Sequence, residues 1–204
     1  MKYFWIVTLL LFSNLLQAQN KQKKLYIGIN FGTGDSEMVH FGLIADDGGN
    51  YSKNYKSVGV SFLSNLSKSI DLETGITITN HPDLSYSPPF YPGRPDTMYY
   101  DSKTLVAIPV LARIHFWKYF FINPGLVFSI DPSKQTERFD NQSGIGLNLG
   151  FGAQYDFDFG LSLFANPYLR FYTMPISFSG VNYPEHLTES GFRFGIMYRL
   201  TKGD

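Results

Sequence analysis

Charged residues make up only 17% of this 204-residue chain, and five ionisable residues stand out by their spacing. They fall in three segments that alternate apolar and polar residues: Asp71, Glu73, Arg113, His115 and Arg199. Alternation of this kind predicts β-strands, with all five side chains on the polar face. A charge enclosed in a narrow interior is costly unless it is paired. The spacing therefore predicts a Glu73–Arg113 ion pair within a network that fills a barrel interior, which we favour over a path for protons.

Two further arginines, Arg170 and Arg193, are expected near the external ends of neighbouring strands. Two like charges so placed need an anionic partner, which Glu185 or Glu189 in the last predicted loop could supply. A lipid phosphate is the alternative partner, because a guanidinium group binds phosphate through paired donors. The sequence leaves both partners open.

Three of the four histidines fall in polar segments that we expect to be external loops. With neighbouring hydroxyl and carboxyl groups they could activate a nucleophile, as in small barrels that modify the acyl chains of lipid A. The two candidate sets are His186 with Ser190 and Glu189, and His40 with Ser36 and Asp35; the third histidine is His81. Loops are naturally rich in such residues, so we favour solvated loop residues over an enzyme. No ligand spacing predicts a metal site, and no residue set predicts a catalytic or cofactor-binding site.

The segments that position these residues are predicted to be β-strands along almost the whole chain. Eight segments alternate along their length: 25–31, 58–62, 70–79, 106–116, 120–130, 144–155, 161–171 and 192–200. Three connections are short (65–69, 117–119 and 156–158) and four are long and polar (33–55, 80–103, 131–143 and 173–190). Alternating short and long connections are typical of outer-membrane barrels, with short periplasmic turns and long external loops. The sequence therefore predicts an all-β fold, an eight-stranded antiparallel up-and-down transmembrane barrel with both chain ends in the periplasm.

The two faces of these strands decide between a membrane barrel and a soluble one. Leu147, Leu149, Ile76 and Phe194 fall on the apolar face, whereas the opposite face is rich in Gly, Asn, Ser, Thr, Arg and Glu. Eight strands enclose an interior only wide enough for side chains. We therefore expect the apolar face to meet lipid and the polar face to fill the interior, without a pore. A secreted soluble barrel that binds a small apolar ligand would need the opposite arrangement.

Three prolines interrupt the predicted strands, namely Pro109, Pro124 and Pro167. Each lacks the N–H that a strand donates to its neighbour. A closed barrel has no free edge to accommodate them, so we expect local bulges, above all at Pro124-Gly125.

The first 18 residues carry a base followed by a short apolar run and a small residue before a cleavage point, which predicts a secretory signal peptide over 1–18 and a barrel domain over 19–204. The later sequence has no apolar run long enough for a membrane-spanning helix. Equal numbers of basic and acidic residues argue against nucleic acid as a partner, and the absence of cysteine excludes disulfides and thiol chemistry.

Segments 105–113, 121–125 and 144–150 resemble the Gram-negative outer-membrane β-barrel domain family, the PorT-like group, with an OmpA/OmpX-type eight-stranded barrel. The resemblance implies an outer-membrane location and shared structural motifs, and the family has no common catalytic residues. This chain departs from many such barrels because it continues past Tyr198 and Leu200 into 201–204 instead of ending on an aromatic residue.

The expected function is that of a non-enzymatic outer-membrane protein whose external loops form the contact surface. Segment 86–100, rich in Pro and Tyr, suits recognition of a partner or a glycan as well as packing over the barrel mouth. Expected partners are outer-membrane lipids, the assembly machinery and periplasmic chaperones during biogenesis, and an extracellular or envelope protein. The alternatives are a lipid A-modifying enzyme and the soluble barrel.

Overall fold

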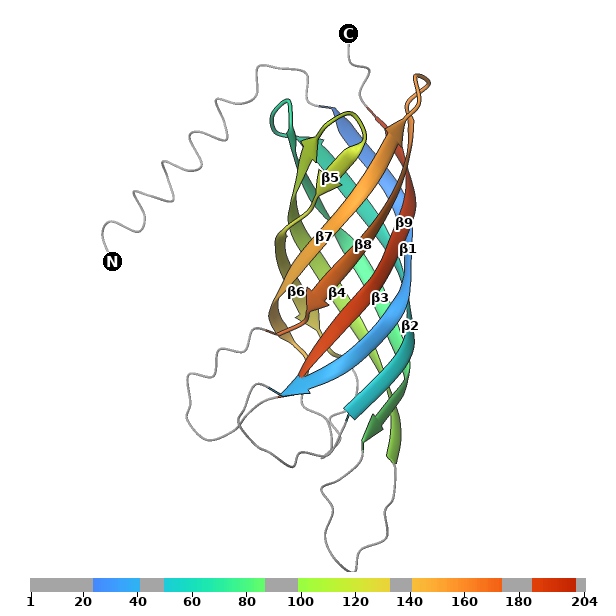
Figure 1. The fold of residues 1–204 in the computed structure, drawn as a ribbon, viewed down its shortest axis with the longest axis vertical. Coiled ribbons are helices and arrows are strands. Elements are labelled where there is room, and N and C mark those ends of the chain that lie inside the picture. Colours follow the sequence, from blue (N-terminus) through green and yellow to red (C-terminus); the bar gives the residue numbers. More distant parts are fainter. Residues whose placement is uncertain (1–23, 41–49, 87–98, 133–140, 174–184, 201–204) are drawn as a thin grey trace, which may run out of the picture.

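The computed structural model describes residues 24–40, 50–86, 99–132, 141–173 and 185–200, so the expected signal peptide and most of segment 86–100 lie outside the described residues. The strands are β1 (Leu25–His40), β2 (Asn50–Asn65), β3 (Ile70–Tyr86), β4 (Tyr99–Phe116), β5 (Phe120–Ile122), β6 (Gly125–Ile130), β7 (Gly144–Asp156), β8 (Leu161–Phe171) and β9 (Glu185–Arg199). Every neighbouring pair is antiparallel, and β1 pairs with both β2 and β9, which closes the ring (Figure 1). β5 and β6 lie end to end between β4 and β7. β5 and β6 together occupy one strand position, so the nine strands form eight positions around the ring. The predicted eight-stranded barrel is confirmed.

The alternating side chains point as the sequence predicts. Ile76, Leu149 and Phe194 lie on the outer wall and are 53%, 57% and 51% exposed, whereas Asn148 and Arg193 point inward and are 5% and 4% exposed. A wall of exposed Ile, Leu, Val and Phe around a polar interior is the arrangement of a barrel in lipid. The opposite arrangement, expected of a soluble ligand-binding barrel, is excluded for the described strands.

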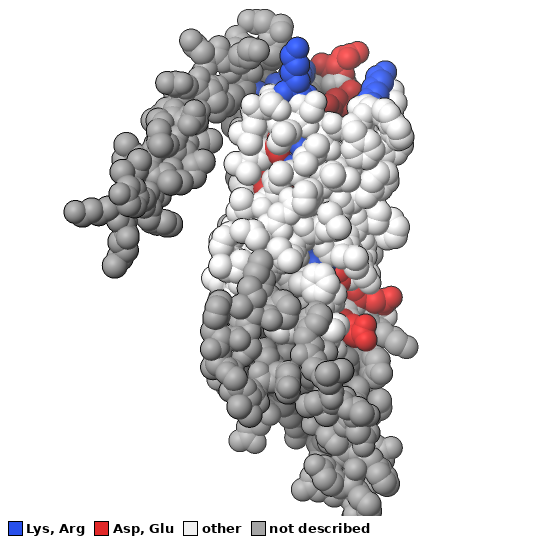
Figure 2. All heavy atoms as spheres, turned by 60° about the vertical axis from the view of Figure 1, so that its left-hand side comes forward, with Lys and Arg blue, Asp and Glu red and all other residues white. Residues whose placement is uncertain are grey.

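The apolar belt of the outer wall ends at a row of polar residues. Thr33 pairs with Lys56, Lys56 with Asn80, and Asn80 with Thr104, so these four residues form one cross-strand row over β1 to β4. The Asn80 amide also donates to the Thr104 hydroxyl at 3.1 Å. On the face in Figure 2, charged side chains gather at the upper end and beside the border of the grey atoms, and only small charged patches are visible between them. This row marks the external border of the belt.

Beyond this border the barrel continues on one side only. β9, β1, β2, β3 and β4 extend outward past the ends of β6, β7 and β8, and form a raised wall at the lower end of Figure 1. The last β4–β6 pair is Val106–Ile130, whereas β4 begins at Tyr99. The sequence predicted loops over much of the raised wall. That prediction was wrong. Above the lipid the outward residues become polar, so the apolar alternation that predicts a strand ends before the strand itself ends.

The raised wall contains the two irregular registers of the described ladders. One lies between Gly34 and Ser36 in the β1–β2 ladder, opposite Asn54, whose φ of 64° is in the left-handed region that Asn tolerates. The other lies between His81 and Leu84 in the β3–β4 ladder. Bulges increase the local twist and redirect side chains.

The three prolines interrupt ladders without shifting their register. At Pro124 the strand is interrupted, with β5 ending at Ile122 and β6 beginning at Gly125, but both segments keep one register with β4 and with β7, so the bulge predicted at Pro124-Gly125 is wrong. At Pro109 and Pro167 a ladder loses pairs but keeps its register, so the bulges predicted there are wrong. A missing donor interrupts the hydrogen bonds without requiring an extra residue.

The short turns join the strands at the end where the described chain begins and finishes (Figure 1, upper end). The seam between the first and last strands is the ladder from Tyr26–Arg199 to His40–Glu185, which contains fifteen consecutive pairs. The described part of the chain contains no helix with the length and apolar character needed to cross a membrane.

Candidate functional site

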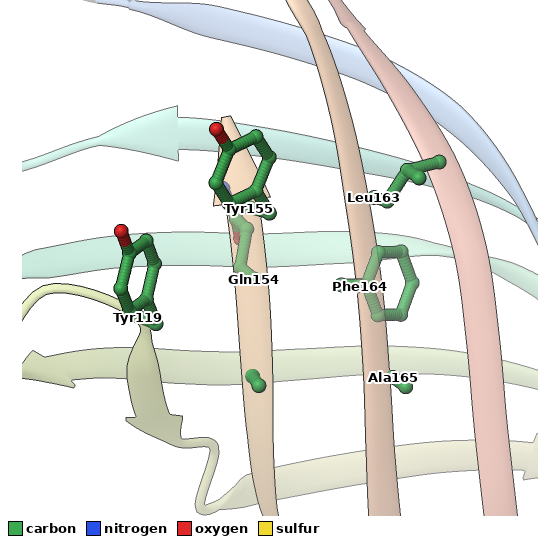
Figure 3. Close-up of a pocket in the computed structure, with 7 residues that line it drawn as sticks. Tyr119, Gln154, Tyr155, Leu163, Phe164 and Ala165 are labelled. Carbon is green, nitrogen blue, oxygen red and sulfur yellow. The ribbon is translucent and has the colours of Figure 1, made fainter. Parts of the chain in front are cut away.

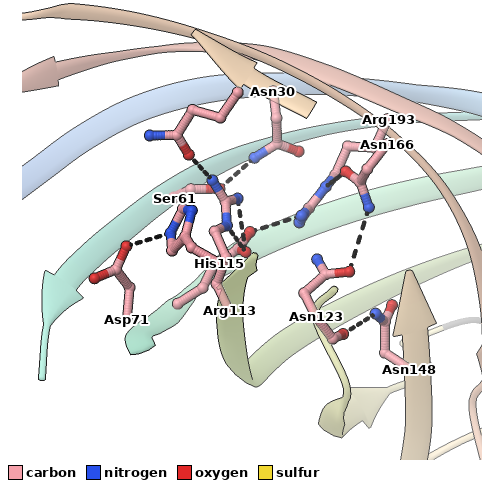
Figure 4. Close-up of polar contacts among 11 residues, drawn as sticks. Asn30, Ser61, Asp71, Arg113, His115, Asn123, Asn148, Asn166 and Arg193 are labelled. Carbon is pink, nitrogen blue, oxygen red and sulfur yellow. Dashed lines mark hydrogen bonds and ion pairs between the residues drawn. The ribbon is translucent and has the colours of Figure 1, made fainter. Parts of the chain in front are cut away.

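The interior of the barrel is filled in three layers. An apolar cluster of Tyr26, Leu63, Phe121, Phe164 and Met197 occupies the periplasmic end. A second apolar cluster occupies the external end and contains Met38, Leu84, Leu105, Ala107, Val127, Tyr172 and Leu187. Between and beside them runs a polar network, part of which is drawn in Figure 4. The network is the candidate site because it holds the charged residues that alternation brings together.

Glu73 on β3 lies between two guanidinium groups. Arg113 donates to Glu73 Oε2 from Nη2 at 2.7 Å and from Nε at 3.0 Å. Arg193 Nη2 lies 2.7 Å from Glu73 Oε1, close enough for an ion pair although its N–H is not directed along the contact. All three side chains are almost fully buried. The ion pair expected between Glu73 and Arg113 is present, and Arg193 adds a second cation to it.

Arg113 is held from several sides. Its Nη1 donates to Gln154 Oε1 on β7 at 2.6 Å. Its guanidinium carbon lies 4.3 Å from the centre of the Phe121 ring and 4.9 Å from that of Phe164. Stacking on aromatic rings suits the planar, weakly hydrated guanidinium group. The periplasmic apolar cluster therefore also supports the charge above it.

Three asparagines connect the Glu73 centre to the external half of the interior. Arg193 Nε donates to Asn166 Oδ1 at 3.1 Å, and the Asn166 amide lies 3.5 Å from Asn123 Oδ1. Asn148 donates to the Asn123 carbonyl at 3.2 Å and accepts from Arg170 Nε at 3.3 Å. Sequence reasoning placed Asn148 on the polar face but gave these residues no role, because partners on separate strands depend on the register.

The external half of the network is centred on Glu189. Its carboxylate accepts from Tyr172 and, at 3.1 Å, from Tyr168. His81 Nε2 lies 3.2 Å away and Arg170 Nη1 lies 3.6 Å away. His81 Nδ1 lies 3.0 Å from the Ser36 hydroxyl. Six strands (β1, β3, β4, β7, β8 and β9) thus contribute to one buried chain of polar groups from Arg113 to Ser36.

Asp71, His115 and Arg199 lie at the periplasmic rim. His115 Nε2 contacts Asp71 Oδ2 at 2.7 Å, and Asn65 donates to Asp71 Oδ1 at 2.7 Å. Arg199 Nη2 donates to the Asp158 carbonyl in a turn at 3.3 Å, so it lies apart from the Glu73–Arg113 pair with which the sequence grouped it. The last strand reaches the rim at Arg199, one layer below the Glu73 centre.

Arg170 and Arg193 do not reach lipid. Both are buried in the interior at 1% and 4% exposure, which overturns the lipid phosphate as their partner. The sequence placed them near the external ends because it placed the start of the last strand at 192. β9 begins at Glu185, so Arg193 lies in the middle of the barrel and Arg170 pairs across the ladder with Glu189. Of the two acidic partners considered, the structure brings Glu189 to Arg170, and nothing is described of the Glu185 side chain.

Neither predicted nucleophile set is assembled. Ser190 is exposed on the outer wall, whereas Glu189 points inward, and His186 is buried against Thr173. Asp35 is also exposed, whereas Ser36 points inward, and the His40 side chain lies outside the described residues. His81 and His186 are buried in strands instead of solvated in loops. Period-two alternation separates neighbours in sequence, and the combination Ser36, His81 and Glu189 comes instead from three strands.

The buried core of the network carries more positive than negative charge. Three guanidinium groups, of Arg113, Arg170 and Arg193, face two carboxylates, of Glu73 and Glu189. These side chains are 0–4% exposed. Buried charges of this kind, paired and enclosed by apolar layers, join the strands that carry them.

No family model matches the chain, and no curated protein matches it, so the PorT-like resemblance stays a prediction. Among solved structures, the chain is similar to the outer membrane protein OprG from Pseudomonas aeruginosa (12% identity, TM-score 0.48, covering 91% of this chain and 99% of that one). It is also similar to Ail, the attachment invasion locus protein of Yersinia pestis, solved with the heparin analogue sucrose octasulfate (12% identity, TM-score 0.40, 87% and 99% covered). A third similar structure is the de novo designed TMB2.3 (8% identity, TM-score 0.44, 90% and 99% covered).

The character of this chain follows from its own side chains. Its strands form a closed ring, its outer wall carries a continuous apolar belt, and its interior is polar. Closed barrels with lipid-facing apolar residues and a periplasmic set of short turns are the β-proteins of the bacterial outer membrane. The chain is an outer-membrane β-barrel.

Proposed function

We propose that this barrel is a non-enzymatic outer-membrane protein whose raised wall serves as a contact surface for an extracellular or envelope partner. The observation that carries the proposal is the one-sided extension of β9, β1, β2, β3 and β4 above the belt. A barrel needs strands only as long as the bilayer requires, about 9–11 residues each. β1 to β4 contain 16 to 18 residues each.

The outer face of the raised wall is polar and faces solvent. Asp35 and Glu37 on β1 are exposed there, above the exposed Lys56 and Asn80 of the border row. The inner face is covered by the external apolar cluster, which keeps the wall upright without lipid. A rigid polar sheet above the membrane supports recognition with a small loss of conformational entropy.

The filled interior argues against transport as the function. Purified protein in planar lipid bilayers should give no conductance steps, because the Glu73 centre and the two apolar clusters close the interior. Reproducible ion conductance would contradict a purely contact role.

Site-specific photo-crosslinking on intact cells tests the contact surface. A photoreactive residue at Glu37 should give a discrete crosslinked product, while the same residue at Lys68 in a periplasmic turn should not give that product. Equal crosslinking from both positions, or none from several wall positions, would contradict the proposal. During biogenesis we expect the periplasmic chaperones and the barrel assembly machinery to bind the unfolded chain.

One observation favours a second candidate, a lipid A acyl-modifying enzyme. Ser36, His81 and Glu189 are arranged as a hydroxyl, a base and an acid, at 3.0 Å and 3.2 Å. Ser36 is only 4% exposed, and Glu189 is already engaged by Tyr168 and Tyr172, which favours a structural role. Mass spectrometry of lipid A from cells that express wild type, Ser36→Ala or no barrel tests this activity. Identical lipid A profiles in all three would exclude a lipid A-modifying enzyme, and a change in lipid A that depends on Ser36 would establish one.

A further inference from the structure

The lipid-facing wall is hollowed at one place near the periplasmic turns. The hollow has a volume of about 390 Å³ and is lined by Tyr119, Ala153, Gln154, Tyr155, Leu163, Phe164 and Ala165 (Figure 3). Ala153 and Ala165 belong to β7 and β8 and point outward, into the apolar belt. The hollow is therefore open to the membrane and not to the interior.

The sequence explains the hollow through one cross-strand row. Phe120 pairs with Ala153, Ala153 with Ala165, and Ala165 with Phe194, so two methyl groups lie side by side between two phenyl rings. Directly opposite residues in a sheet have Cβ atoms about 5 Å apart. Two alanines in such a row leave a gap about the width of a hydrocarbon chain, bounded by Phe120 and Phe194.

The periplasmic rim of the hollow has polar groups suited to a lipid headgroup. The Tyr119 and Tyr155 rings are stacked, with centroids 5.8 Å apart and planes 20° apart. Figure 3 shows their hydroxyl groups pointing the same way, towards the end of β7. The Lys118 ammonium lies 5.0 Å from the centre of the Tyr119 ring, and its hydrogen bond with Tyr119 raises the pKa of Lys118. A cation and two hydroxyls thus lie at the depth where aromatic residues meet phosphate groups.

We propose that this hollow is a phospholipid site, which holds one acyl chain over Ala153 and Ala165 and the lipid phosphate against Lys118 and the two tyrosine hydroxyls. The occupant is a phospholipid of the periplasmic leaflet, because the rim faces the turns. A second apolar groove around Pro124, Leu147 and Leu169 lies at mid-height of the wall, and its lining residues include no cation. The site is independent of what the raised wall contacts.

The test is native mass spectrometry of the intact barrel, released from detergent after titration with dioleoyl phosphatidylglycerol. Wild type should retain one lipid in preference to further ones. Ala165→Leu should weaken that first binding about tenfold, since the larger side chain displaces about two methylenes from the hollow. Lys118→Gln should weaken it about fivefold, as expected for one lysine near an anionic lipid surface.

Matched controls separate the site from general adhesion of lipid. Ala112→Leu enlarges another outward alanine, on β4, and Lys68→Gln removes a lysine from a different turn; both should bind as wild type. Heat-modifiable migration on a gel verifies that each variant is folded. Millimolar inorganic phosphate should not displace the lipid, because the chain supplies part of the binding.

Three results would overturn the proposal. The first is equal lipid retention by wild type and Ala165→Leu. The second is equal loss of lipid in Ala112→Leu and Ala165→Leu. The third is full displacement of the lipid by inorganic phosphate, which would reduce the site to a phosphate contact at Lys118.

Discussion

Glu73 shares one negative charge between two buried guanidinium groups, so its loss and the loss of Arg193 have unequal consequences. Without Glu73, Arg113 and Arg193 face each other with no carboxylate between them. Without Arg193, Glu73 keeps a two-donor contact with Arg113. An unpaired buried charge costs far more than a lost hydrogen bond. The network therefore depends on its acid more than on its second base.

We expect Glu73→Gln to lower the free energy of unfolding by about 3–5 kcal/mol. Arg193→Gln should lower it by only about 1 kcal/mol, since a neutral pair remains. Urea unfolding in phospholipid vesicles measures both. Asp158→Asn is the control, because only the Asp158 backbone carbonyl accepts from Arg199. Equal losses for Glu73→Gln and Arg193→Gln would show that the shared carboxylate is not the centre of the network.

Sequence reasoning at this scale succeeded where two residues lie on well-alternating strands. Glu73 and Arg113 meet because both lie on polar faces at similar depth. It failed for Arg170, Arg193 and His81. Their depth depends on where the strands end, and polar outward residues near those ends leave no alternating pattern to mark them. The Ser36–His81–Glu189 arrangement requires the register of three strands, and no local pattern specifies that register.

Among the elements, β8 shows how the barrel accommodates a proline inside a strand. The β7–β8 ladder pairs Gly150 with Tyr168 and next pairs Ala153 with Ala165, so the pairs beside Pro167 are missing while the register holds. On the other side, Pro167 still pairs with Phe192 of β9. Alternation along 161–171 was strong enough to predict the strand despite its proline, but it did not indicate which ladder would lose hydrogen bonds.

Restoring the donor at this position should strengthen the ladder. Pro167→Val supplies an N–H towards β7 and keeps an apolar side chain in the belt. We expect the free energy of unfolding to rise by about 0.5–1.5 kcal/mol, the usual net value of a hydrogen bond. Pro132→Val, outside the ladders, is the matched control. A decrease with Pro167→Val would mean that the backbone here depends on proline geometry.

For the whole molecule, the height of the apolar belt sets how the barrel sits in the membrane. Ile76 lies within the belt, and Thr33 lies in the polar row at its external border. Short turns and the described chain ends lie at the opposite end. The overall architecture and its orientation were readable from alternation and connection length. The raised wall was not, because strands above lipid no longer need apolar outward residues.

The depth of the belt predicts a position-dependent cost for an added charge. Ile76→Arg should lower the free energy of unfolding in vesicles by about 2–4 kcal/mol, and Thr33→Arg by about 0–1 kcal/mol. In detergent micelles, which adapt to the protein, the difference should shrink. A larger loss for Thr33→Arg would move the border of the belt outward.

Orientation is testable without background, since the chain contains no cysteine. Glu37→Cys in the raised wall should react with a membrane-impermeant maleimide on intact cells, whereas Lys118→Cys in a periplasmic turn should react only after lysis. If only Lys118→Cys were labelled on intact cells, the barrel would have the opposite orientation in the membrane. Both variants must react fully once the cells are opened.

The strand ladders around the ring differ in length, and this has a mechanical consequence. Fifteen uninterrupted pairs join β1 to β9, whereas the strand position of β5 and β6 is interrupted at Asn123 and Pro124. A force that opens the barrel wall should therefore meet less resistance at Asn123 and Pro124, where single hydrogen bonds to Gly150 and Ala112 replace ladder pairs, than between the terminal strands. The barrel should open first beside β5 and β6, and its terminal strands, β1 and β9, should leave the membrane last and as a pair.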